Sequence, residues 1–109
     1  MPMRETKVVL RYRNSEPVTG VLLTLEFQEE DGRWLGECIE FGTAAFANSL
    51  PEVKKELTEA ILLQLNEMEA LGFIEGFLHE HKAVSVAISR GVPMPPGTSW
   101  AEPELIGTH

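Results

Sequence analysis

The sequence predicts an α+β fold, in which one long amphipathic helix packs on one face of a small antiparallel sheet of three to four strands. Three observations lead to this prediction. Residues 21–28 alternate apolar and polar side chains, and this period of two is typical of a half-buried strand. An acidic turn that ends in Asp31-Gly32 follows, and this dipeptide favours a hairpin. Ser49 and Glu52 then have the spacing of a capping box, which marks the start of a helix.

Further elements are predicted on either side of the helix. Two strands follow the hairpin turn, at residues 33–39 and 43–47, with a break at Gly42 between them. After the long helix, residues 73–81 have a short helical pattern, and residues 83–88 alternate again. The predicted fold therefore includes a second helix and a C-terminal strand.

An additional strand is predicted near the N-terminus, at residues 6–13, joined to the next strand by a loop at residues 14–20. Lys7, Arg11 and Arg13 lie on one side of this strand. They indicate either a cationic patch for a partner or the charge protection of an edge strand, and we favour edge protection.

The long helix is predicted over residues 50–71, with Gly72 ending it in a left-handed conformation. Leu62 and Leu63 fall outside its apolar stripe, so either a second subunit or the C-terminal segment is needed to cover them. We favour homo-oligomerisation as a dimer or tetramer, with Trp100 as a further interface residue. The stripe that faces the sheet contains Val53, Leu57, Ile61, Gln64, Leu65, Met68 and Leu71, with Ala60 at its margin.

The C-terminal residues 90–109 form a tail rich in proline and glycine, in which no regular structure is expected. The full chain of 109 residues suits a single domain, with its core between residues 21 and 88. No apolar run approaches the roughly 20 residues that span a bilayer. The N-terminus lacks the apolar core of a signal peptide, so a cytoplasmic location is expected.

The chain is acidic, with a formal net charge of −8 from 17 acidic and nine basic residues. Such a field repels nucleic-acid phosphates, so DNA binding by this chain is disfavoured. It favours a basic protein partner, because opposite potentials speed encounter. Acidity that only maintains solubility is the alternative explanation.

Few residues are candidates for chemistry. His79 and His81 are two residues apart, so on a helix they diverge, and we expect surface histidines rather than the metal site of a hydrolase. Cys38 is the single cysteine and is predicted to be a small buried side chain rather than a nucleophile. The sequence contains no phosphate-binding loop, dinucleotide fingerprint or nucleophile elbow. We therefore predict no catalytic residue, no metal site and no cofactor.

The order of these motifs resembles the HicB-like antitoxin family. The resemblance rests on the hairpin EEDGRWLGEC (29–38), the segment FGTAAFANS (41–49) and the helix LPEVKKELTEAILLQL (50–65). In that family a strand, an Asp-Gly turn, a strand ending near a "pelg" segment, a small-residue strand and a capped helix follow in this order. Glu40-Phe41-Gly42 stands in place of the "pelg" segment, and ALGFIEGFLHEHK (70–82) is similar to the tail of shorter relatives. The resemblance covers residues 21–88.

The resemblance implies a partial ribonuclease-H-like fold without ribonuclease activity, namely a three-stranded sheet with a helix on one face. Family members neutralise a small basic ribonuclease toxin and commonly form dimers or tetramers. Full antitoxins also carry a C-terminal DNA-binding domain. This chain departs from the family there, because only the short Pro-rich tail follows Arg90, and it also has an extension at residues 1–20.

We therefore predict a non-catalytic protein-binding domain of the HicB type. The predicted partner-binding residues are Glu29, Glu30, Asp31 and Glu37. The alternative is an orphan homo-oligomeric scaffold with a small-molecule pocket near Trp34 and Trp100.

Overall fold

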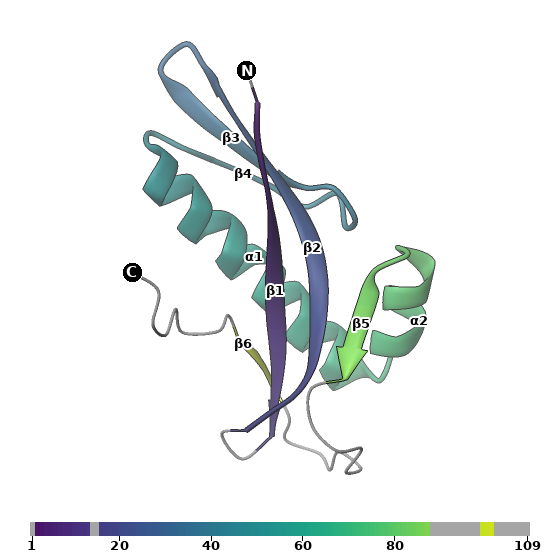
Figure 1. The fold of residues 1–109 in the computed structure, drawn as a ribbon. Coiled ribbons are helices and arrows are strands. Elements are labelled where there is room, and N and C mark those ends of the chain that lie inside the picture. The colour runs from purple at the N-terminus through teal and green to yellow at the C-terminus, as the bar shows by residue number, and fades with distance from the viewer. Residues whose placement is uncertain (1, 14–15, 88–98, 102–109) are drawn as a thin grey trace.

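Six strands form one antiparallel sheet, and a single long helix, α1, packs across one face of it (Figure 1). The computed structural model describes residues 2–13, 16–87 and 99–101. The predicted α+β class is confirmed. In chain order the elements are β1 (Met3–Arg13), β2 (Glu16–Glu30), β3 (Arg33–Cys38), β4 (Ala44–Ala47), α1 (Leu50–Leu71), α2 (Ile74–Glu80), β5 (Val84–Ala87) and β6 (Ser99–Ala101).

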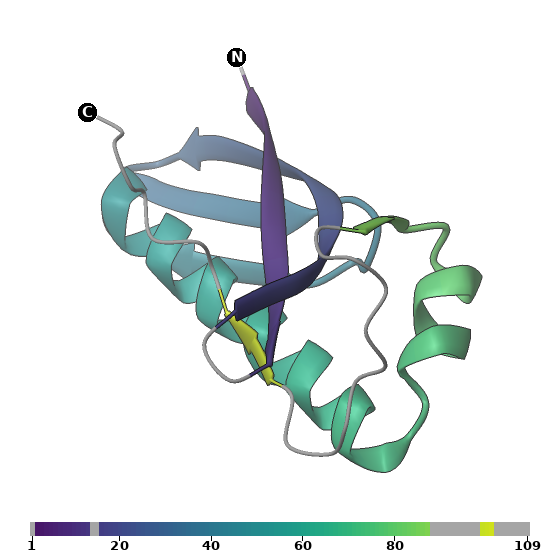
Figure 2. The same cartoon turned by 60° about the horizontal axis from the view of Figure 1, so that its bottom comes forward.

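The strand order is β4-β3-β2-β1-β6, and β5 pairs with β2 beside β3. The long strand β2 therefore has two partners on one edge. Its residues 25–30 pair with β3, and its residues 19–22 pair with β5. On its other edge it pairs with β1 along almost the whole length of both strands. Figure 2 shows β6 beside β1 at the end of the sheet where α1 finishes.

The predicted hairpin between β2 and β3 is confirmed. Its two turn residues, Asp31 and Gly32, both have positive φ, at 52° and 79°. Such a turn follows the right-handed twist of the flanking strands, and Asp-Gly adopts it at low cost.

Two predictions about irregular segments are wrong. Residues 16–20 belong to β2 rather than to a loop. Pro17 is tolerated in this strand because it lies close to the start, opposite Tyr12 and next to a register shift. Ser99, Trp100 and Ala101 of the tail form the short strand β6 along β1. The proline-rich composition gave no sign of this strand, because its partner lies almost 90 residues earlier in the chain.

The helix α1 begins and ends where the sequence predicts. The Ser49 side chain accepts a hydrogen bond from the Glu52 backbone N–H at 3.3 Å, and its hydroxyl donates to the Glu52 carboxylate at 3.2 Å. Gly72 has a φ of 78°, and its N–H donates to the Glu69 carbonyl at 3.1 Å. These bonds satisfy backbone groups that a helix end leaves without partners.

The core lies between α1 and the sheet. It is formed by the odd-numbered apolar residues of β2 and by one stripe of the helix, which contains Val53, Leu57, Ile61 and Leu65. Leu71, predicted to belong to this stripe, is 58% exposed, because it lies in the last turn, where the chain leaves α1 toward α2. None of the described helices is long and apolar enough to cross a membrane.

Candidate functional site

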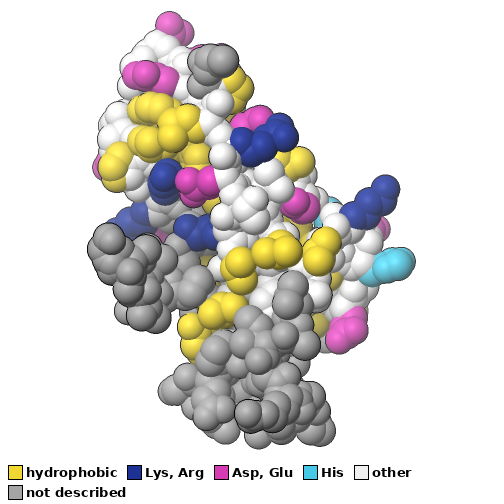
Figure 3. Space-filling view, in the orientation of Figure 1, with side chains coloured by type: hydrophobic (Ala, Val, Ile, Leu, Met, Phe, Trp, Pro, Cys, Tyr) yellow, Lys and Arg dark blue, Asp and Glu magenta, His cyan; other side chains and the backbone are white. Residues whose placement is uncertain are grey.

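The side of the sheet that faces away from α1, called here the open face, has exposed apolar residues. Register places Val8, Leu22 and Val84 in one row across β1, β2 and β5. Val84 is 57% exposed, and Ile39, which follows β3 on the same face, is 46% exposed. Leu10 and Tyr12 of β1 extend this apolar region. Figure 3 views the open face and shows apolar side chains next to both acidic and basic ones.

Charged residues of both signs occupy the other half of the open face. Register places Arg4, Glu26 and Glu37 in one row, with Glu26 in the middle. The Arg4 guanidinium donates to the Glu26 carboxylate at 2.6 Å, which offsets the repulsion between the two opposed carboxylates. Glu30 and Arg33 lie opposite each other in register, closer to the hairpin turn.

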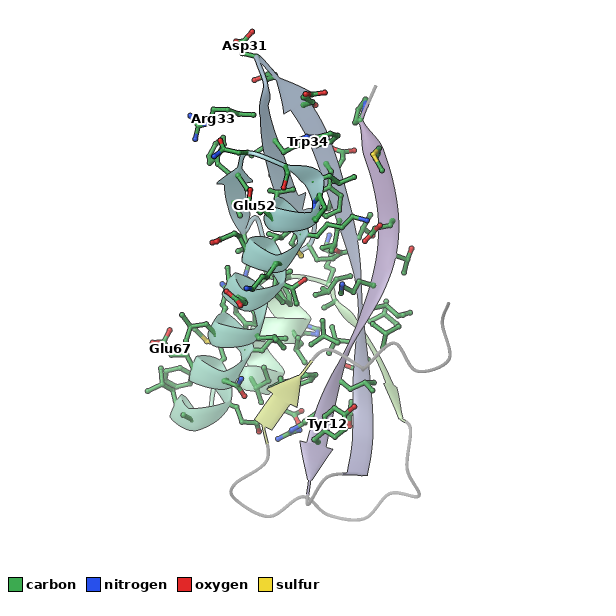
Figure 4. All side chains as sticks on the ribbon, turned by 90° about the vertical axis from the view of Figure 1, so that its left-hand side faces the viewer. Tyr12, Asp31, Arg33, Trp34, Glu52 and Glu67 are labelled. Carbon is green, nitrogen blue, oxygen red and sulfur yellow. The ribbon has the colours of Figure 1, made fainter. Side chains whose placement is uncertain are left out.

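The four predicted partner-binding acids are all exposed, but they do not share one surface. Glu30 and Glu37 lie on the open face by strand alternation, together with Glu26, which the sequence did not single out. Glu29 points to the α1 side, and Asp31 lies at the tip of the hairpin (Figure 4). The structure therefore brings together two of the four predicted acids.

An exposed aromatic residue adjoins these acids. Phe46 of β4 is 60% exposed, lies on the open face opposite Leu35, and has the Arg33 guanidinium 5.5 Å from its ring centre. A small pocket of about 180 Å³ lies here, lined by Trp34, Leu35 and Phe46 together with charged residues of the hairpin. Sequence reasoning missed Phe46, although it is the one large side chain in an otherwise small-residue strand.

The basic side of β1 faces α1, so the prediction that its charges protect an exposed edge is wrong for Arg11. The Arg11 guanidinium forms an ion pair with the Glu69 carboxylate of α1, and only 14% of the Arg11 side chain is exposed. The same carboxylate accepts a hydrogen bond from the Trp100 indole N–H at 2.8 Å. Glu69 thus joins β1, β6 and α1.

Trp100 is a core residue of the subunit, being 3% exposed, rather than an exposed residue of an oligomer interface. The Asn66 side chain accepts from its backbone N–H at 2.8 Å and donates to its carbonyl at 3.4 Å. These bonds hold β6 against the end of α1. The two leucines predicted at an interface differ, since Leu62 is partly buried and Leu63 is 70% exposed on the far side of α1.

Trp34 and Trp100 lie at opposite ends of α1, so the structure does not bring them into one pocket. Trp34 pairs with Ala47, close to the start of α1, whereas Trp100 contacts residues near its end. A separate groove of about 370 Å³ lies beside Trp100, and Arg11, Thr19, Ser85, His79 and Leu78 are among its lining residues.

The two neighbouring histidines diverge, as predicted. His79 is exposed, whereas the His81 ring packs on Phe77 at 4.5 Å and on Phe41 at 5.8 Å. The Nδ1 atom of His81 lies 3.1 Å from the Glu40 carbonyl, which can only accept, so this nitrogen carries the proton. In the part of the chain that the structure describes, no group of three His, Cys, Asp or Glu residues is placed to hold a metal ion.

Cys38 is fully buried, as predicted, between the sheet and α1. Burial raises the pKa of its thiol from 9.0 to about 11, and the nearby Glu40 carboxylate adds to this rise. The thiol is therefore neutral at physiological pH, and a neutral, inaccessible thiol is a poor nucleophile.

An apolar groove of about 520 Å³ lies between the end of α1 and α2, lined mainly by Met68, Phe73 and Phe77. Phe73 is 61% exposed at its rim.

Comparisons of the chain with protein-family models, with curated proteins and with solved structures find no match.

Proposed function

We propose that this chain is a non-catalytic protein-binding domain of the HicB-like antitoxin type, and that its open face binds a small basic ribonuclease and blocks it. The observation that supports this proposal is the open face itself. It presents Val84 and Ile39, which are 57% and 46% exposed, beside the carboxylates Glu26, Glu30 and Glu37. Contiguous exposed apolar area with charged surroundings is characteristic of protein-binding surfaces.

Charge supports a basic partner. The chain carries a net charge of −8, so a cationic protein is attracted from a distance and then docks on the apolar half of the face. Arg4 and Arg33 lie among the carboxylates in the charged half of the open face. This half therefore presents both signs of charge, and a partner with the complementary pattern docks in one orientation.

The test needs the small basic protein that an adjoining reading frame would encode. RNA cleavage by that protein is measured with and without an equimolar amount of this chain, and we expect cleavage to stop. Calorimetry then compares Glu37→Lys, on the open face, with Glu67→Lys on the far side of α1 (Figure 4). The two variants change the net charge equally, so only a specific contact distinguishes them.

We expect Glu37→Lys to weaken the complex at least about tenfold, and Glu67→Lys to change only its salt dependence. Val84→Asp, which places a charge in the apolar half, should abolish binding. Undiminished RNA cleavage, or equal affinities of the two lysine variants, would contradict the proposal.

The second candidate is a scaffold that binds a small molecule in the groove beside Trp100. It is favoured by the volume of about 370 Å³, which lies within the usual range for ligand pockets, and by the buried Arg11 Nε atom, which has no partner among the described residues. A thermal-shift screen of small carboxylates and phosphates tests it. A stabilising ligand whose effect persists in Ser85→Tyr, a variant that fills the groove, would exclude this site.

A further inference from the structure

The strand β4 is the last strand in the order of the sheet, and among the described residues it pairs only with β3. The Cys38 N–H donates to the Thr43 carbonyl at 2.8 Å, directly before β4 begins. Hydrogen-bonded and non-bonded pairs alternate along two antiparallel strands. The residues of β4 whose backbone N–H and C=O groups point away from β3 are therefore Ala44 and Phe46.

This edge lacks the usual protection against a further strand. Edge strands commonly carry charged side chains or proline, which prevent another chain from pairing with them. The sequence of β4 is AAFA, without charge or proline. Ala44 is exposed, and the Phe46 side chain is 60% exposed. Three of the four side chains are methyl groups, so they leave room for another backbone.

We propose that the outer edge of β4 binds an extended segment of another protein as an additional antiparallel strand, and that this segment alternates apolar and basic side chains. Main-chain hydrogen bonds to a sheet edge are an established mode of peptide recognition. The proposal goes beyond the proposed function, because it uses the edge of the sheet rather than the open face and does not require a ribonuclease.

The apolar side chains of the segment belong on the open face. Side chains directly opposite Ala44 and Phe46 point to the same face as these two residues. The Arg33 guanidinium already lies 5.5 Å from the centre of the Phe46 ring on this face. A second cation there would be repelled, whereas an apolar side chain gains contact with the ring.

The remaining side chains of the segment point toward the α1 side of the sheet, where the nearest charge is negative. The strand β4 lies alongside the first turns of α1 (Figure 1). The Thr43 hydroxyl donates to the Gln64 side chain at 2.6 Å, so Gln64 marks the flank of α1 that is next to β4. Glu56, Ala60 and Gln64 are four residues apart and form one row along this flank.

Glu56 is available to a basic partner. It is exposed and has no ion-pair partner among the described residues. The two lysines of α1, Lys54 and Lys55, line the groove beside β1 and therefore lie on the other flank of the helix. No lysine or arginine of α1 competes with a basic side chain of the segment, so charge complementarity favours lysine or arginine at these positions.

The experiment uses a synthetic peptide as the probe, an acetylated and amidated heptapeptide of sequence TVKVRVT. Calorimetry measures its binding to the full chain, and backbone amide hydrogen exchange locates it. We expect the amides of Ala44 and Phe46 to exchange at least about tenfold more slowly with the peptide, because they gain acceptors. The amides of Ala45 and Ala47, which already face β3, should change little.

Two methylated peptides test the strand pairing without altering the protein. In the proposed register the valine amides face β4 and the lysine amide points away from it. Methylation of the central valine nitrogen should weaken binding at least about tenfold, because a donor to β4 is lost and a methyl group intrudes. Methylation of the lysine nitrogen is the matched control and should have little effect.

Variants of the chain test the charge and the edge. Glu56→Lys should weaken binding of the peptide several-fold, whereas Glu59→Lys, an equal charge change on the flank that lines the groove beside β1, should not. Ala44→Pro removes only a backbone donor that points outward, which an edge strand tolerates, and it should weaken binding at least about tenfold. Circular dichroism establishes that each variant is folded.

A peptide that does not bind at a concentration of about 1 mM overturns the proposal. So does a peptide that binds without slowing exchange at Ala44 and Phe46, or that is weakened equally by the two methylations. Equal effects of Glu56→Lys and Glu59→Lys would overturn the assignment of the basic side chains. Self-association of the full chain that Ala44→Pro abolishes, with no binding of the peptide, would assign the edge to a second copy instead.

Discussion

The Glu40 carboxylate accepts hydrogen bonds from both the backbone N–H and the hydroxyl of Thr24, at 2.7 and 2.9 Å. Here β2 changes partners, because its pairing with β5 ends at Leu22 and its pairing with β3 begins at Leu25. The Ile39 N–H donates to the Thr24 carbonyl at 2.9 Å. Residues 39 and 40 therefore complete the edge of β2 between the part that pairs with β5 and the part that pairs with β3.

Replacement of Glu40 should destabilise the fold. Glu40→Ala removes the acceptor of the Thr24 N–H, and a partly buried donor without a partner costs about 1–3 kcal/mol. Glu40→Gln keeps one acceptor oxygen and should cost less. Urea unfolding measures both effects. Glu37→Ala, an exposed carboxylate three residues away, is the matched control and should change the free energy of unfolding by less than about 0.5 kcal/mol. Equal losses in Glu40→Ala and Glu37→Ala would refute this role of Glu40.

Gly36 is required because of the space around it. A Cβ atom at this position would lie 2.9 Å from Phe27 Cε1 and 3.2 Å from Val53 Cγ2, both core side chains. Gly36→Ala should therefore destabilise the protein by about 1–3 kcal/mol through overpacking. Gly76→Ala in α2, where nothing lies within 4 Å, should instead be neutral or stabilising. Thermal unfolding of the two variants measures whether each substitution lowers or raises the stability. A Gly36→Ala protein as stable as the wild type would contradict the prediction, because the core would then accommodate the added methyl group without loss of stability.

The sequence predicted the elements that depend on local chemistry. The bounds of α1 follow from Ser49, Glu52 and Gly72, which act within one turn of the helix, and the hairpin follows from Asp31-Gly32. The sequence did not predict β6, because Trp100 is held by Asn66 and Glu69, which are more than 30 residues away. Contacts at such separations leave no periodic pattern in the sequence.

The face of a strand is harder to predict than the strand itself. Alternation in β1 separates Val8, Leu10 and Tyr12 from Lys7 and Arg11, but it does not say which set faces the helix. The ion pair with Glu69 and the contact with Trp100 place the basic set there. The apolar set consequently lies on the open face, which is why the candidate binding surface is partly apolar and not only acidic as predicted.

The buried thiol of Cys38 should make the protein less stable at high pH. Its pKa is raised from 9.0 to about 11, so below pH 9 the thiol is protonated in both the folded and unfolded states and contributes no pH dependence. Between pH 9 and 11 only the unfolded state loses the proton, and the free energy of unfolding falls by about 1.4 kcal/mol per pH unit. Urea unfolding between pH 8 and 10.5 measures this slope, at about half-unit intervals.

Cys38→Ala is the control, because it removes the titrating group. The variant should be less stable at pH 8, since a fully buried side chain loses an atom, but its stability should fall less steeply above pH 9. Identical slopes in the two proteins would show that other groups cause the alkaline loss of stability.

Glu69 should control whether β6 stays attached. Its side chain is 16% exposed and accepts from both the Arg11 guanidinium and the Trp100 indole, so Glu69→Ala leaves an almost buried cation and an indole N–H without their acceptor. A loss of about 3 kcal/mol is expected from breaking such a pair. In a Trp34→Phe background, Trp100 is the only tryptophan, and its fluorescence should shift to longer wavelength and become accessible to iodide.

The control is Glu67→Ala, which removes an exposed carboxylate two residues away on the far side of α1 and should leave the Trp100 emission unchanged (Figure 4). Glu69→Gln distinguishes charge from hydrogen bonding. It keeps an acceptor for the indole but not the charge that neutralises Arg11, so it should lose stability while Trp100 stays protected. Emission from Trp100 that remains protected in Glu69→Ala as well would mean that Asn66 alone holds β6, since its side chain bonds both the N–H and the carbonyl of Trp100.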